Sequence, residues 1–214
     1  MKNRAIRSAQ RSIAVLWTIA FVGCTEKSTP ASADAGIEVR ELTSTAHRFR
    51  MPLWHQWKSM SVDGDSGGGT HVERIAAARR MGGKAVFEVA PRIEITSEPT
   101  IAADPESAYR AVKSDVERIG QQPGIEVVRS SLGFRPIGPE MVGDLSFRYR
   151  VGGAKGREVR QRSLLVFREM PSGPQVLSIT ATFLARDLER IEPEIQRMFA
   201  AVELFSPPDG GTIR

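Results

Sequence analysis

The chain has 214 residues and a formal net charge of +5, from 30 Lys and Arg side chains against 25 Asp and Glu. Four of the basic residues and none of the acidic ones lie in the first 23 residues, so the remaining chain has a net charge of only +1. This balance argues against a nucleic-acid-binding domain, which needs a clear basic excess. The single cysteine excludes a disulfide within the chain, so the fold must depend on its apolar core.

The first 23 residues have the order of an export signal. Four basic residues precede an apolar run over residues 13–22, and no acidic residue lies among them. A membrane-spanning helix needs about 20 apolar residues, so this run is too short for a permanent anchor. We therefore predict that residues 1–23 are a signal peptide, removed on export. The basic residues are Lys2, Arg4, Arg7 and Arg11.

The apolar run ends in Phe21-Val22-Gly23-Cys24, which resembles the lipobox of bacterial lipoproteins. The resemblance implies cleavage before Cys24 and a diacylglyceryl group on its sulfur, although the family usually has Leu where this chain has Phe21. The residue after Cys24 is Thr25, and not the aspartate that would resemble an inner-membrane retention signal. This favours the outer membrane, facing the periplasm, if the cell has one. Ala31-Ser32-Ala33 offers an alternative cleavage site, but it lies farther from the apolar run.

Composition divides the rest of the chain into a linker, a domain and a tail. Residues 25–36 have no large apolar side chain and cannot form a core. We predict the lipidated Cys24 and a flexible linker over residues 24–44, one folded domain over 45–205, and a flexible tail over the Pro/Gly-rich residues 206–214.

The first half of the domain has weaker signals than the second. Residues 37–57 predict an extended segment broken at Pro52, followed by a glycine-rich loop over residues 61–70. Residues 72–81 are a candidate short helix. Apolar residues then alternate over residues 84–96, which predicts one bent strand or two short ones.

The clearest helix begins after Asp104, a favourable N-cap residue followed by Pro105 at the first helical position and Glu106 in the first turn. Its apolar stripe is formed by Tyr109, Val112, Val116 and Ile119. This spacing predicts an amphipathic helix that packs one face against a core.

Four extended segments and a closing helix follow. The strands are expected over residues 125–137, 141–151, 157–170 and 175–184, with a glycine-rich hairpin turn at 152–156. The last helix carries apolar residues from Leu188 to Val202 and tolerates Pro193 near its start or at a kink. This order predicts an α+β fold with helices packed on a single antiparallel sheet.

From Asp104 to Val202 the sequence resembles the periplasmic DcrB-like and PsbP-like domains. The similarity lies in the capped helix, the long hairpin, Leu177-Ser178-Ile179-Thr180 and Ile195-Gln196-Arg197-Met198-Phe199. It implies a non-catalytic envelope domain that works through contacts. It transfers no functional residue to this chain.

A catalytic site has little support in the sequence. Gly64-Asp65-Ser66-Gly67-Gly68 copies the active-site stretch of trypsin-like proteases, but too few residues precede Ser66 to form their first barrel. The same loop matches a calcium loop incompletely. His47, His55 and His71 do not have the one-turn helical spacing of a zinc pair. We therefore predict no enzyme, catalytic residue, metal or cofactor.

Arginines gather on the predicted hairpin. If its turn is centred near residues 153–154, Arg148 lies opposite Arg160 and Arg150 opposite Glu158. Like charges directly across a strand pair are destabilising, so such a pair is either solvated or suited to an anion. The solvated face is the simpler interpretation. The functional hypothesis is that Arg148, Arg160 and Arg162 dock an acidic partner or an anionic lipid headgroup.

These observations predict a membrane-tethered binding or assembly module. The alternatives are a carrier of an apolar ligand between sheet and helix, and an envelope hydrolase that uses Ser66.

Replacing Cys24 with alanine tests the tether. We expect the Cys24→Ala chain to lose its lipid and its membrane neighbours, as measured by cross-linking in living cells, affinity capture and mass spectrometry. The Ser66→Ala chain should keep the wild-type phenotype. A lost phenotype in Ser66→Ala would instead support the hydrolase.

Overall fold

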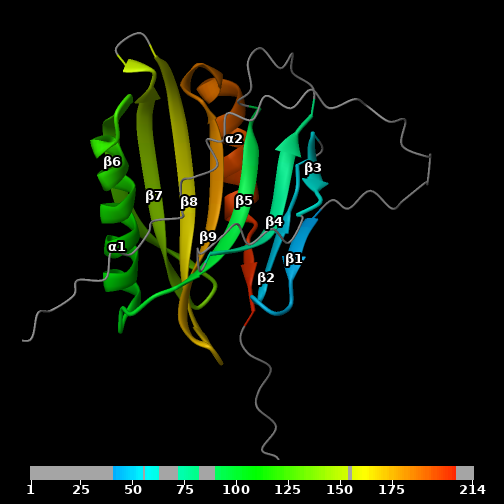
Figure 1. The fold of residues 1–214 in the computed structure, drawn as a ribbon. Helices are drawn as coiled ribbons and strands as arrows, with labels where there is room; N and C mark the ends of the chain where they lie inside the picture. Colours follow the sequence, from blue (N-terminus) through cyan, green and yellow to red (C-terminus); the bar gives the residue numbers. More distant parts are fainter. Residues whose placement is uncertain (1–40, 55, 63–71, 82–89, 154–155, 206–214) are drawn as a thin grey trace, which may run out of the picture.

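The computed structural model describes residues 41–54, 56–62, 72–81, 90–153 and 156–205. Two antiparallel sheets are formed there (Figure 1). The larger has the order β3-β4-β5-β9-β8-β7-β6, from Trp57–Met60, Glu73–Arg80, Arg92–Pro99, Gly173–Leu184, Arg157–Met170, Glu140–Val151 and Ile125–Ile137. The smaller has the order β1-β2-β10, from Glu41–Ser44, Phe49–Pro52 and Glu203–Leu204.

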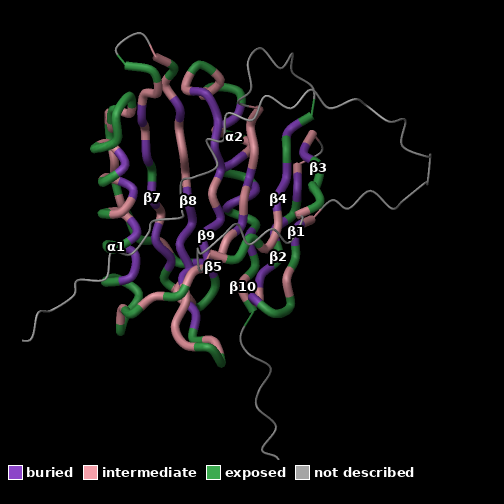
Figure 2. Tube along the Cα trace, viewed as in Figure 1, coloured by how far each residue is buried: buried purple, intermediate pink, exposed green. Residues whose placement is uncertain are grey.

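Two α-helices cover opposite faces of the large sheet. Helix α1 (Pro105–Arg118) continues into the short 3₁₀ helix η1 (Ile119–Gln121), and η3 (Ala185–Asp187) leads into α2 (Leu188–Ala200). Leu165 packs with α1 and its neighbour Leu164 packs with α2, because successive side chains of a strand point to opposite faces. The small sheet shares the α2 face. Buried positions are concentrated in the central strands (Figure 2).

Most elements of the second half confirm the sequence analysis. Strands β6 and β8 have the predicted bounds, and β7 and β9 begin one and two residues earlier than expected. The Asp104 carboxylate caps α1 by accepting a hydrogen bond from the Ser107 backbone N–H at 2.9 Å. The predicted apolar stripe of α1 is buried.

The prediction of a single sheet is wrong. The extended segment expected over residues 37–57 forms β1 and β2 and then reaches β3, which belongs to the large sheet. Strand β2 also pairs with β10, where Phe49 lies opposite Leu204. The small sheet therefore joins the two ends of the domain, and Phe49 and Met51 are fully buried in its core.

The predicted linker boundary is also wrong, since β1 begins at Glu41 and not after residue 44. Leu42 is 5% exposed and packs in the core with α2, which fixes this segment. The rest of the predicted linker, the signal peptide with Cys24, and the tail over residues 206–214 lie outside the described residues. Among the residues described, no helix is both long and apolar enough to cross a bilayer.

Residues 72–81, predicted as a short helix, form strand β4. The stretch Glu73-Arg74-Ile75-Ala76-Ala77-Ala78 has good local helix formers, but β4 pairs with β3 on one side and β5 on the other. Ala78 is fully buried opposite Ile93. Tertiary pairing has overridden local propensity. Strand β5 confirms the second part of the segment predicted over residues 84–96, and residues 84–89 lie outside the described residues.

Helix α1 is fixed to the sheet through Tyr109. Its hydroxyl donates to the Met141 carbonyl at 3.2 Å and accepts from the Phe167 backbone N–H at 2.9 Å. Gly143 makes room for the ring, because a Cβ atom there would lie 2.9 Å from Tyr109. Burial raises the pKa of the Tyr109 hydroxyl, so it stays protonated and able to donate.

Helix α2 is fixed by a buried ion pair. The Glu194 carboxylate accepts hydrogen bonds from Arg80 Nε and Nη2 and from Trp57 Nε1, each at 2.8 Å. Burial raises the pKa of Glu194, but the hydrogen bonds from Arg80 and Trp57 outweigh it, so the pKa is lowered overall. Strands β3 and β4 are thereby tied to α2.

Replacing Glu194 with alanine should destabilise the domain strongly. The change removes the carboxylate that accepts two hydrogen bonds from the buried Arg80 and one from Trp57. We therefore expect the free energy of unfolding to fall by about 3 kcal/mol. Urea unfolding followed by tryptophan fluorescence measures it. Glu189→Ala, at an exposed position of α2, is the matched control and should change stability by less than about 0.5 kcal/mol.

Candidate functional site

The hairpin of β7 and β8 has the predicted register. Arg148 pairs with Arg160, and Arg150 pairs with Glu158. On the other side of β7, Arg129 of β6 also pairs with Arg148. The three side chains Arg129, Arg148 and Arg160, here named the arginine row, therefore lie on adjacent strands. They are on the sheet face that α2 shares, opposite the face that packs against α1.

Carboxylates neutralise the arginine row only in part. Arg148 Nε lies 3.2 Å from Glu158, but the same carboxylate is also 3.9 Å from Arg150. Arg150 has a second partner in Glu126 at 2.8 Å. Within the described residues Arg129 and Arg160 have no ion pair, and the buried Arg160 Nε has no hydrogen-bond acceptor.

This arrangement leaves a local positive charge. Arg150 and the three arginines of the row share two carboxylates, Glu126 and Glu158, so the local excess is two positive charges. Like charges directly opposite one another on neighbouring strands are destabilising. An anion placed over the row would relieve this repulsion and would give Arg129 and Arg160 a partner.

Arg162, the third residue of the predicted docking site, has a different environment. Its guanidinium contacts Asp144 at 3.0 Å and Glu192 of α2 at 2.6 Å. Burial lowers the pKa of Arg162, but its hydrogen bonds with the two carboxylates raise it, and the net direction is upward. Arg162 therefore holds α2 against the sheet, and its charge is already compensated.

Arg129 was not found from the sequence because of an irregularity in β6. Between Val127 and Arg129 the strand contains a bulge, which inserts one residue relative to β7. The bulge places Arg129 opposite Arg148, where regular alternation would place residue 128. No local sequence signal marks this position, since Val127-Val128-Arg129-Ser130 contains neither Gly nor Pro.

A second row of cations occupies the opposite face of the large sheet. Lys58, Arg79 and Arg92 pair across β3, β4 and β5, and Arg92 lies 3.8 Å from Glu94. Lys58 and Arg92 both have further interactions within the protein. This second row also has three cations but lies on the opposite face of the sheet, so a change in it is a control for changes in the arginine row.

The other candidate residues show no catalytic arrangement in the described part of the chain. His47 is 8% exposed and contacts Ser44 at 3.1 Å and Glu73 at 3.4 Å, which is a structural role. Ser66, His55 and His71 lie outside the described residues. No group of three His, Cys, Asp or Glu side chains suited to a metal occurs within the described ranges.

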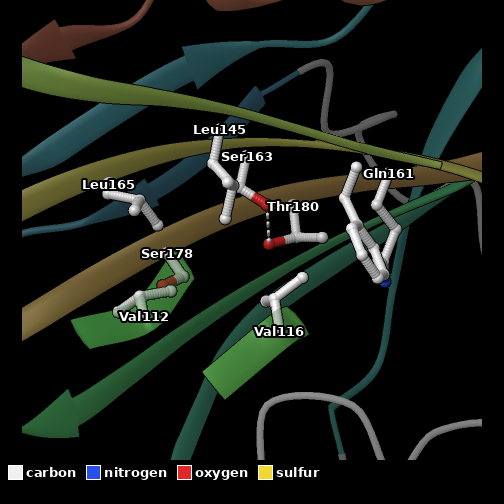
Figure 3. Close-up of a pocket in the computed structure, with 9 residues that line it drawn as sticks. Val112, Val116, Leu145, Gln161, Ser163, Leu165, Ser178 and Thr180 are labelled. Atoms are coloured by element: carbon white, nitrogen blue, oxygen red, sulfur yellow. Dashed lines mark hydrogen bonds between the residues drawn. The ribbon is translucent and has the colours of Figure 1, made fainter. Parts of the chain in front are cut away.

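A small hollow lies between α1 and the sheet (Figure 3). Val112 and Val116 of α1 face Leu145 and Leu165, and the polar Ser163 and Thr180 form a hydrogen bond of 2.9 Å across its floor. The hollow has a volume of about 10 Å³, about the space that one water needs. A carrier of an apolar ligand would need a cavity of about 300 Å³ or more.

Glu98 of β5 lies on the α1 face of the sheet, away from the arginine row. Burial and the nearby negative charge of Asp115 raise its pKa from the ordinary value of 4.5 to about 7. The folded chain therefore holds a proton on Glu98 that the unfolded chain releases above about pH 4.5.

This proton makes part of the stability depend on pH. Because the pKa is raised on folding, the stabilising contribution is fully present below pH 4.5 and is lost as the pH rises through about 7. We expect the Glu98→Gln chain to lack this loss, because glutamine does not titrate. Urea unfolding at pH 5.5 and pH 7.5 for both chains measures the difference, and equal pH dependence in the two would contradict the prediction.

Comparison with known proteins identifies the fold and no family. No protein-family model matches the sequence, and the search of curated proteins gives no significant match. Among solved structures the chain is similar to LpqN of Mycobacterium tuberculosis, described as involved in cell envelope biogenesis. The TM-score is 0.54 at 11% identity, over 74% of this chain and 83% of that chain.

Two further structures are less similar. CyanoP, the PsbP protein of the cyanobacterium Synechocystis, has a TM-score of 0.47 at 10% identity, over 82% of this chain and 98% of that chain. The Ran-binding protein Mog1p of Saccharomyces cerevisiae has a TM-score of 0.43 at 8% identity, over 77% of this chain and 94% of that chain. A PsbP protein is thus among the structural neighbours. Of these three structures, only LpqN has a TM-score above 0.5, so the conclusion that the fold is shared is drawn from LpqN.

Proposed function

We propose that this chain is a lipid-anchored, non-catalytic protein of the cell envelope that docks an acidic segment of a partner protein on the arginine row. The observation that carries the proposal is the cross-strand register of Arg129, Arg148 and Arg160, of which Arg129 and Arg160 have no carboxylate partner among the described residues. Such a row costs stability in the free protein, and a bound acidic segment would compensate that cost.

Two features support the envelope as the location. The sequence has the signal and lipobox order that ends at Cys24. LpqN, whose fold the chain shares, is described as involved in cell envelope biogenesis. Lipid on Cys24 would hold the domain at a membrane, and the location that we propose is the outer membrane, facing the periplasm.

An acidic protein segment fits the arginine row better than an anionic membrane surface does. Membrane binding through charge uses clusters of about four to eight basic residues. Here Glu126 and Glu158 lie among the arginines and reduce the excess to two charges. A protein segment can place single carboxylates beside Arg129 and Arg160, which lie two strands apart, and keep them away from the two glutamates.

Charge reversal of the unpaired arginines tests this function. A photo-cross-linker at Ser146, an exposed residue on the same face, should capture one dominant protein in cells that express the full chain. We expect the Arg129→Glu, Arg160→Glu double variant to lose that product, because repulsion replaces attraction. Mass spectrometry of the captured product identifies the partner and its acidic segment.

Arg79→Glu, in the second cation row on the opposite face, is the matched control and should keep the cross-linked product. An unchanged product in the double variant would show that the arginine row is not the docking site. Capture of lipid in place of protein at Ser146 would favour the anionic headgroup instead.

A further inference from the structure

Strand β6 forms one edge of the large sheet. It has 13 residues and pairs only with β7 within the described residues. The other edge strand, β3, has only four residues. A long edge strand presents a row of backbone groups to which another strand can add.

Pro136 indicates which backbone groups of β6 point outward. Proline has no N–H and is tolerated at an edge where its nitrogen faces away from the neighbouring strand. Pro136 pairs with Met141 of β7, so this position lies in a pair without hydrogen bonds. Because direction alternates along a strand, Ser130, Leu132 and Phe134 also direct their N–H and C=O groups away from β7.

The protein covers the beginning of this edge but not its remainder. Gly120 of η1 lies against Val127, and the Ser130 hydroxyl is hydrogen-bonded to Glu117 of α1. Beyond Ser130, no backbone hydrogen bond of the described residues reaches the outer side of β6. Phe134 is 43% exposed at this part of the strand.

We propose that residues 130–134 of β6 accept the acidic partner segment as an added antiparallel or parallel strand. This inference rests on the proposed function and names how the partner is held. Arg129 lies on the edge strand itself, so every second side chain of an added strand projects on the face of the arginine row. Glutamates at those positions place carboxylates beside Arg129, the member of the row nearest the edge.

The charges of β6 favour a partner over a second copy of this chain. Antiparallel pairing of two β6 strands centred on Leu132 would bring Arg129 of each copy opposite Arg135 of the other. Like charges directly across a strand pair are destabilising, and the two contacts would occur together. Arg135 is held by Asp144 at 3.4 Å in this chain and has no second carboxylate within the described residues.

A backbone substitution separates strand addition from simple charge attraction. The probe is a fluorescein-labelled peptide of seven residues that alternates valine and glutamate, added to the full chain in a non-ionic detergent. Phe134→Pro removes one outward N–H, and Phe134→Ala removes the same ring but keeps that N–H. We expect Phe134→Pro to bind the peptide about tenfold more weakly than Phe134→Ala, as measured by fluorescence anisotropy.

The outcomes distinguish the two proposals. Equal binding by Phe134→Pro and Phe134→Ala overturns strand addition, even where Arg129→Glu, Arg160→Glu weakens binding and so supports the arginine row. No binding of the peptide by the wild-type chain also overturns strand addition. Thermal unfolding of both Phe134 variants checks that they remain folded. Hydrogen exchange adds a direct readout, because the amides of Leu132 and Phe134 should become protected when the peptide binds.

Discussion

The register between β7 and β8 determines what each face of the large sheet can do. Leu145, Phe147 and Tyr149 are buried toward α1, while Ser146, Arg148 and Arg150 lie on the other face. A slip of one residue would exchange the two sets, burying arginines and exposing aromatic rings. The same constraint that secures the core therefore also brings Arg148 and Arg160 together, and the protein cannot separate them without losing the hairpin.

This register was predictable because turn and pattern agreed. The glycines at residues 152, 153 and 156 fixed the centre of the hairpin, and Gly152 and Gly153 adopt positive φ values of 94° and 72°. Alternation on both strands then gave the pairing of Arg150 with Glu158. Helix α1 was equally accessible from sequence, since Asp104 and Pro105 are specific start signals that the structure confirms.

Other parts depended on contacts that no short stretch of sequence records. Strand β4 resembles a helix locally and becomes a strand because β3 and β5 pair with it on both sides. Arg129 joins the arginine row through a bulge that lacks a sequence signal. Arg162 shared the predicted face, but its compensation by Glu192 requires knowing where α2 lies. In each case the missing information was the position of an element distant in the chain.

The pairing of β2 with β10 has a consequence for the order of folding. Phe49 near the beginning of the domain meets Leu204 near its end, and Trp57 reaches Glu194 of the last helix. The α2 face of the sheet cannot be closed until residues 188–204 are present. A chain that leaves a ribosome or crosses a membrane with its N-terminus first would therefore be unable to complete this fold until almost its last residues have appeared. Until then it would remain unfolded enough to pass through a narrow channel.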